Sequence, residues 1–144
     1  MKEIKAEIKI LASAEKVWNV ISDFQNYSKW NPIIHKITGE PKVGTKISVH
    51  LTTVGGKNRV YHPKVIKVEA PHEIRWYGKF FSSGIFSGER VLTIDKISET
   101  EVNFTNKEIF SGLGVKFTTK KMQEDILASF ESMNNSLKKK IELT

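Results

Sequence analysis

The most regular pattern of apolar positions lies near the end of the chain, at residues 118–142. Apolar side chains recur there every three or four residues: Met122, Ile126, Phe130, Met133, Leu137 and Ile141. This spacing predicts a helix with one apolar face, about 40 Å long. A helix of this length needs a broad apolar surface to lie on. We therefore expect the preceding strands to supply a sheet.

The chain begins with alternating apolar and charged residues, and Lys2–Ile10 is predicted to form a half-buried strand. Ser13 then has the character of a helix N-cap, opening a short helix that ends near Ser22. Residues 25–29 are expected to form a second short helical turn. Pro32 ends that turn because the residue before a proline is driven out of the helical region.

The middle of the chain predicts strands separated by turns rather than by helices. The expected strands are 33–38, 46–53, 58–69, 73–81, 86–97 and 100–110. Pro63 predicts a bulge or an edge position in the third of them. Gly78, Gly84 and Gly88 predict bends in a curved sheet. The expected fold class is α+β: a curved antiparallel sheet of about six to seven strands wrapped around the long C-terminal helix, with two short helices after the first strand.

Composition is that of a water-soluble globular chain, with 39% apolar and 27% charged residues among 144. We expect a single domain spanning residues 1–144. The absence of cysteine excludes disulfides, a thiol nucleophile and cysteine-bound metals. The opening residues lack a signal peptide's apolar core, and nothing approaches the ~20 apolar residues of a membrane span. We therefore expect a cytoplasmic protein without a transmembrane segment, as a monomer or weak homodimer.

The net charge of +7 raises the question of nucleic-acid binding. The lysines are dispersed, however, and residues 138–140 form the one lysine run. Arginine, which reads bases and phosphates best, occurs three times. A solvated lysine-rich surface is the favoured interpretation, so no nucleic-acid partner is expected.

Several motifs, taken in order, resemble the START-like (SRPBCC) superfamily, whose bacterial members are often labelled polyketide cyclase/dehydrase or lipid-transport proteins. They span nearly the whole chain: ASAEKVW at 12–18, Asp23-Phe24, Tyr27, Trp30-Asn31-Pro32, Gly44-Thr45, VEAP at 68–71, IRW at 74–76 and FESMN at 130–134. The resemblance implies a helix-grip fold with an internal cavity for a hydrophobic small molecule. It implies no catalytic motif, because the superfamily shares none.

The expected cavity lies between the sheet and the terminal helix. Its apolar wall is predicted to include Ile47, Val49, Leu51, Trp76, Leu92, Phe104, Met122, Ile126 and Phe130. Leu137 and Ile141 are expected to be plain core. Tyr27 and Trp30 are placed at the cavity mouth; the alternative is that these aromatics only anchor short helices that would be marginal alone.

Arg90, Asn106 and Glu108 fall on the apolar face of the last predicted hairpin. With the turn at Ser98 and Glu99, the simplest register sets Arg90 opposite Asn106, with Glu108 as a diagonal neighbour. Buried unpaired charges are costly, so Arg90 and Glu108 are expected to pair. They would form a polar spot that orients a ligand's carboxylate, hydroxyl or carbonyl group. The alternative is that a bulge at Gly88 turns both into solvent.

His35, His50, His62 and His72 show no ligand-like spacing, so neither a metal nor a cofactor is expected. His62 shares the parity of Val60 and is predicted to face the cavity. No nucleophile motif or glycine-rich phosphate loop is present, and no catalytic residue is assigned.

The expected function is therefore binding of a hydrophobic or aromatic small molecule, lipid- or polyketide-like, by a protein that is not a catalyst. One alternative is a cyclase/dehydrase or aromatase-type enzyme, in which Glu108 with Arg90 or His62 supplies the acid–base group. Another is an adaptor that binds a protein or nucleic acid through its basic surface.

Overall fold

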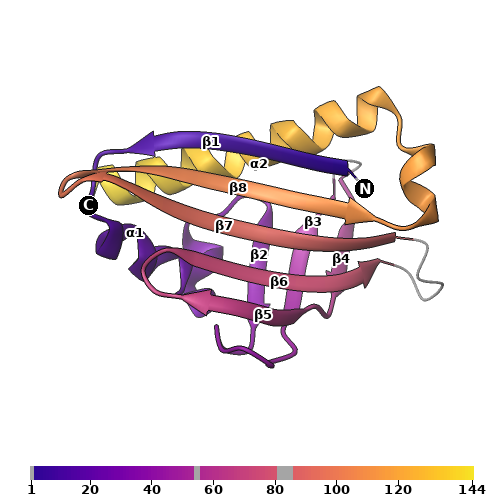
Figure 1. Ribbon diagram of the computed structural model, residues 1–144, viewed down its shortest axis with the longest axis horizontal. Coiled ribbons are helices and arrows are strands. Elements are labelled where there is room, and N and C mark those ends of the chain that lie inside the picture. Colours follow the sequence, from indigo (N-terminus) through magenta and orange to yellow (C-terminus); the bar gives the residue numbers. More distant parts are fainter. Residues whose placement is uncertain (1, 54–55, 81–85) are drawn as a thin grey trace.

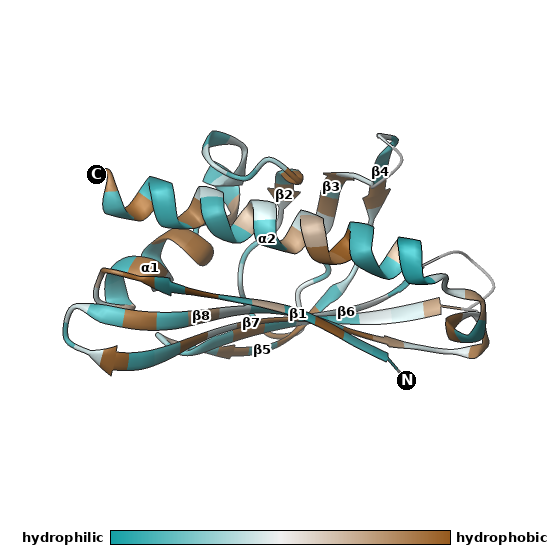
Figure 2. Ribbon diagram, turned by 90° about the horizontal axis from the view of Figure 1, so that it is seen from above, coloured by the Kyte–Doolittle hydropathy of each residue, from teal (hydrophilic) through white to brown (hydrophobic). Residues whose placement is uncertain are grey.

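Two antiparallel sheets and one long helix, α2 (Lys120–Glu142), build the molecule (Figure 1). The computed structural model describes residues 2–53, 56–80 and 86–144. Five strands form one sheet in the order β1-β8-β7-β6-β5, and β2-β3-β4 form the other. Figure 2 shows α2 and the three-stranded sheet on the same side of the five-stranded sheet. This arrangement is the expected helix-grip fold.

The elements follow one another as strand, two short helices, seven strands, a short helix and the long helix. The strands are β1 (Lys2–Ile10), β2 (Ile34–Thr38), β3 (Ser48–Thr52), β4 (Asn58–Tyr61), β5 (Lys64–Glu69), β6 (Glu73–Phe80), β7 (Phe86–Ser98) and β8 (Glu101–Ser111). The other helices are α1 (Ala14–Ile21) and the 3₁₀ helices η1 (Phe24–Lys29) and η2 (Leu113–Phe117).

Local sequence signals account for the helix starts. The Ser13 hydroxyl accepts a hydrogen bond from the Lys16 backbone N–H at 3.2 Å, as expected of an N-cap. Thr119 caps α2 in the same way, accepting from the Met122 N–H at 3.1 Å. The helix therefore begins two residues later than the apolar periodicity alone predicted.

The expected strand 58–69 is two strands, β4 and β5, which belong to different sheets. The break falls at Pro63, which has no N–H to donate to a sheet ladder. Gly78 lies against this break: a Cβ added there would be 3.0 Å from the Pro63 Cβ. The prediction of a single strand over 58–69 was thus wrong, whereas the predicted α+β fold with a large antiparallel sheet and a long C-terminal helix is confirmed. Gly84 and residue 81 lie outside the described residues.

Backbone hydrogen bonds still join the two sheets at this break. The Ile47 N–H donates to the Pro63 carbonyl and the Val65 N–H donates to the Thr45 carbonyl, both at 2.9 Å. These two hydrogen bonds pair backbone groups at the point where the chain passes from one sheet to the other. The result is a sheet surface that folds over toward α2.

The two halves of α2 have different surroundings. Along its C-terminal half, the Asn134 amide donates to the Ala6 carbonyl at 3.0 Å and Glu142 accepts from the Leu11 N–H at 2.8 Å. These contacts fix α2 alongside β1, running in the same direction. Leu137 and Ile141 are buried in the main core, as predicted, whereas Met122 near the helix start is 46% exposed. The C-terminal half of α2 is therefore packed against the core, and the start of the helix is less tightly packed.

Among the described residues, no helix is both long and apolar enough to cross a membrane.

Candidate functional site

A cavity of about 690 Å³ lies beneath the N-terminal half of α2. We call it the main cavity. Its wall comes from the three-stranded sheet, from β7 and β8, and from α2: Ile33, Ile34, Leu51, Thr52, Thr53, Arg59, Val60, Tyr61, Arg90, Glu108, Phe110, Met122, Ile126, Ser129 and Phe130. The wall is mainly apolar, and its volume falls within the usual range for small-molecule sites.

Arg90 and Glu108 form an ion pair in this wall. The Arg90 Nε donates to a Glu108 carboxylate oxygen at 2.7 Å. The two residues are only 8% and 4% exposed. The guanidinium carbon also lies 4.5 Å from the centre of the Phe130 ring, a cation–π contact between the sheet and α2. The mainly apolar cavity therefore contains a buried pair of compensated charges, and Arg59, the other charged residue in its described wall, is exposed to solvent.

Asn106 lies behind this pair and supports it. Its amide oxygen accepts a second hydrogen bond from the Arg90 guanidinium, at 3.3 Å from Nη1. Its amide nitrogen lies 3.3 Å from the sulfur of Met133 on α2. Asn106 is fully buried and does not reach the cavity surface. It holds the guanidinium in place instead of facing a ligand.

The pairing of β7 with β8 differs from the expected register. Arg90 lies directly opposite Glu108, and Leu92 opposite Asn106. The turn lies at Glu99 and Thr100, since Ser98 pairs with Glu101, and the register also shifts between Lys96 and Ser98. The observed pairs are offset by two residues from those predicted. An offset of two leaves every side chain on its original face. Both charges therefore point inward, and the alternative that a slip at Gly88 exposes them is wrong.

Burial controls the ionisation of the groups in this wall. It raises the pKa of the Glu108 carboxyl above its ordinary value, against the opposing effect of Arg90. Burial by itself would lower the pKa of Arg90, but the neighbouring Glu108 and Tyr61 keep it raised, so the guanidinium stays charged. Burial and then Glu108 raise the pKa of the Tyr61 phenol. Tyr61 is thus a neutral phenol in the cavity wall.

Of the residues predicted for the site, six line the main cavity: Leu51, Arg90, Glu108, Met122, Ile126 and Phe130. Five others predicted for the wall are buried in the main core instead: Ile47, Val49, Trp76, Leu92 and Phe104. They belong to the part of the sheet that packs against the C-terminal half of α2 and against α1 and η1. The alternation of apolar and polar residues correctly predicted that these side chains face inward. It could not show where the packed core ends and the cavity begins.

The predicted orientation of His62 is wrong. His62 is exposed, with its Nδ1 2.9 Å from the Ser48 hydroxyl, and Tyr61 faces the cavity in its place. Tyr61 pairs with Val49, which points into the core, and directly paired residues share a face. Val60, which set the predicted parity, is half-exposed at the cavity rim.

Tyr27 and Trp30 do not line the main cavity. The Tyr27 side chain is fully buried, and its hydroxyl donates to the Ile21 carbonyl at 2.5 Å. Its ring packs edge-on against Phe24 at 5.7 Å and lies 5.0 Å from Trp30. These contacts support the alternative interpretation, in which the aromatics anchor α1 and η1 to the core.

Nine wall residues were missed: Ile33, Ile34, Thr52, Thr53, Arg59, Val60, Tyr61, Phe110 and Ser129. Phe110 carried a usable signal, because it shares the face of Glu108 two residues earlier on β8. The residues from β2, β3 and β4 carried none, since their contribution depends on how the smaller sheet folds over.

Comparisons with known proteins agree with this architecture. The profile of the family described as polyketide cyclase / dehydrase and lipid transport matches residues 1–142. No curated protein sequence matches the chain. Several solved structures do resemble it in fold, at identities below 20%.

A START superfamily protein from Mycobacterium smegmatis aligns with a TM-score of 0.79 and 18% identity, over 99% of each chain. The Zhui aromatase/cyclase from Streptomyces sp. R1128 aligns with a TM-score of 0.74 and 15% identity, over 98% of this chain and 93% of that one. A conserved protein from Geobacillus kaustophilus aligns at 0.73 and 13%, over 99% and 96%. At these identities the likeness shows the fold alone. The family profile, which covers nearly every residue, shows more: this chain belongs to the polyketide cyclase/dehydrase and lipid-transport family.

Proposed function

We propose that the protein binds a hydrophobic small molecule, lipid- or polyketide-like, in the main cavity and releases it unchanged. The observation that carries this proposal is a cavity of about 690 Å³ whose mainly apolar wall contains one buried ion pair. Apolar walls supply affinity through burial of the ligand's carbon surface, and a few polar groups fix its orientation.

The ion pair also limits the polar group that the ligand carries. Arg90 and Glu108 compensate each other's charge, so a ligand carboxylate placed beside them would bring an unbalanced negative charge into an apolar space. Arg59, which also lines the main cavity, is exposed to solvent and does not belong to this buried pair. A hydroxyl or carbonyl group avoids this cost. A hydroxyl donates to Glu108 and accepts from the Arg90 guanidinium, and a carbonyl accepts from Arg90. We therefore favour an uncharged oxygen group.

A second candidate function rests on the Glu108 carboxyl. A carboxyl with a raised pKa in the wall of a cavity, next to the Tyr61 phenol, is suited to moving a proton to or from a bound carbonyl compound. Cyclisation or dehydration of a polyketide chain requires such a step. The enzymatic function would therefore use the same cavity and the same residues as the binding function.

Native mass spectrometry of freshly purified protein tests the proposal. We expect a mass above that of the 144-residue chain, and organic extraction should release a neutral apolar compound. If this compound is returned to the protein and recovered unaltered, the binding function is supported; if it is recovered cyclised or dehydrated, the enzyme is. Empty protein that binds nucleic acid in a salt-dependent manner would contradict both.

A further inference from the structure

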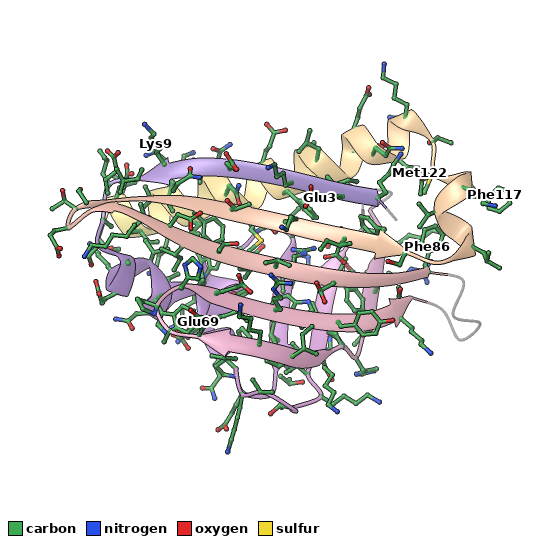
Figure 3. All side chains as sticks on the ribbon, in the orientation of Figure 1. Glu3, Lys9, Glu69, Phe86, Phe117 and Met122 are labelled. Carbon is green, nitrogen blue, oxygen red and sulfur yellow. The ribbon has the colours of Figure 1, made fainter. Side chains whose placement is uncertain are left out.

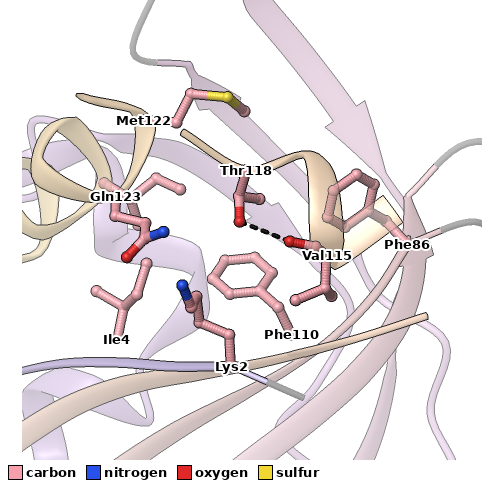
Figure 4. Close-up of a pocket in the computed structure, with 9 residues that line it drawn as sticks. Lys2, Ile4, Phe86, Phe110, Val115, Thr118, Met122 and Gln123 are labelled. Carbon is pink, nitrogen blue, oxygen red and sulfur yellow. Dashed lines mark hydrogen bonds between the residues drawn. The ribbon is translucent and has the colours of Figure 1, made fainter. Parts of the chain in front are cut away.

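A second, smaller space lies beside the main cavity, under the start of α2. We call it the side chamber. Its volume is about 190 Å³, and the atoms that form its surface are apolar. The residues that form it come from β1, the ends of β7 and β8, η2 and α2: Lys2, Ile4, Phe86, Phe110, Val115, Thr118, Met122, Gln123 and Ile126 (Figure 4).

Three residues belong to the walls of both spaces: Phe110, Met122 and Ile126. The partition between the main cavity and the side chamber is therefore made of side chains, not of backbone. Met122 is 46% exposed at the helix start, and an unbranched thioether side chain changes rotamer at little cost. A ligand that displaces it joins the two spaces.

Strand register places the side chamber in line with the polar pair. Arg90, Glu108 and Ile4 lie opposite one another across β7, β8 and β1. The next row on the same face contains Phe110 and Lys2, about 7 Å further along the strands. On α2, Phe130, Ile126 and Met122 occupy successive turns in the same direction, covering about 12 Å. A straight path therefore leads from the ion pair to the side chamber.

The size of the side chamber selects the shape of its occupant. An apolar cavity of about 150 Å³ accepts one benzene molecule and stays free of water. The side chamber is only slightly larger, so it accommodates the end of a chain or one small ring and not the bulk of a large ligand.

We propose that the side chamber binds the end of an unbranched apolar chain whose oxygen-bearing end is held by Arg90 and Glu108. The ligand class is then a neutral single-chain amphiphile, such as a long-chain alcohol or ketone. This inference rests on the proposed binding function and names its ligand class. It assigns a role to Val115 and Gln123, which line the side chamber but not the main cavity.

Displacement of the neutral fluorescent probe N-phenyl-1-naphthylamine by primary alcohols from octanol to tetradecanol tests this inference. In the wild-type protein, we expect affinity to rise by up to about fourfold for each added methylene that becomes buried. Val115→Trp fills the side chamber. It should reduce the affinity for tetradecanol far more than the affinity for octanol, and so bring the tetradecanol-to-octanol affinity ratio toward one.

Leu113→Trp is the matched control, because Leu113 lies in the same short helix, is 75% exposed and lines neither space. It should keep the wild-type ratio. Gln123→Trp blocks the side chamber from α2 and replaces Val115→Trp if circular dichroism shows that variant to be unfolded. An unchanged ratio in a folded blocked variant overturns the inference alone. A wild-type protein that binds none of the alcohols overturns the proposed function as well.

Discussion

The Arg90–Glu108 pair is the residue-scale feature on which the site depends. Each charge is buried, and each is compensated by the other. Removing one partner of a buried pair leaves the other charge without compensation, whereas exposed pairs contribute little because water and ions screen them. The outer face of the same sheet offers a comparison: Arg75, with a 32% exposed side chain, bonds to Glu73 and Glu89 there. Glu73 is only 5% exposed, but it also pairs with Lys67 at 3.1 Å, so that loss of Arg75 does not leave it without a partner.

Arg90→Met is expected to lower the free energy of unfolding by about 3–5 kcal/mol at neutral pH. Arg75→Met should lower it by about 1 kcal/mol or less. Urea denaturation followed by circular dichroism measures both. Equal losses for the two variants would mean that Arg90 and Glu108 are as well solvated as the surface network.

The raised pKa of Glu108 predicts a definite pH dependence. A carboxyl whose pKa is higher in the folded than in the unfolded state favours folding while it is protonated. Its contribution is complete below the ordinary value of 4.5 and is lost as the pH rises through the folded-state value. The stability of the wild type relative to Glu108→Gln should therefore decrease from about pH 4 upward. A difference that stays constant or grows with pH would show that the pKa is not raised.

At the scale of elements, α2 combines a structural half with a cavity-lining half. Leu137 is fully buried in the core, whereas Ile126 lines both the main cavity and the side chamber. Truncating a packed side chain forfeits its contacts, while truncating one that borders empty space forfeits few. Figure 3 shows the start of this cavity-lining half, where Met122 lies near Phe86, the first residue of β7, and Phe117 of η2 projects away from the sheet.

Leu137→Ala is accordingly expected to destabilise the protein by about 2–5 kcal/mol. Ile126→Ala should cost about 1 kcal/mol or less in the ligand-free protein. Chemical denaturation of the two variants after delipidation provides the comparison. A large cost for Ile126→Ala would indicate that the start of α2 is packed as tightly as its end.

Much of this arrangement could be predicted from local sequence. The alternation in Lys2–Ile10, the cap at Ser13 and the apolar stripe of α2 each depend on residues within one element. The inward orientation of Arg90 and Glu108 could be predicted from the alternation of side chains along each strand. An error of two residues in the strand register does not change that alternation. The break at Pro63 was marked by the proline, but its effect on the neighbouring strands was not.

The rest depended on contacts between distant segments. Tyr61 faces inward because of its pairing with Val49, and no signal near Tyr61 records that pairing. Val49 and Trp76 looked like cavity residues but fill the core, because a sequence pattern identifies a buried face and not the empty part of it. The size of the main cavity depends on how far the smaller sheet folds toward α2, and the chain passes between the two sheets at Pro63, which lies against Gly78.

At the scale of the whole molecule, the five-stranded sheet, the smaller sheet and α2 enclose a space that none of them forms alone. Ser129 lines the main cavity from α2, and its hydroxyl donates to the Ile126 carbonyl of the same helix at 2.7 Å. Bulk added at this position occupies the cavity without touching the core cluster around Leu137. The neighbouring Ala128 is exposed and lines neither the main cavity nor the side chamber.

Titration of wild type, Ser129→Trp and Ala128→Trp with N-phenyl-1-naphthylamine tests the central claim most directly. The main cavity is predicted to be the binding site, so wild type and Ala128→Trp should bind the probe with equal affinity. Ser129→Trp should lose at least about tenfold in affinity, the equivalent of about 1.4 kcal/mol, while circular dichroism shows it to be folded. Undiminished binding by folded Ser129→Trp would contradict the account.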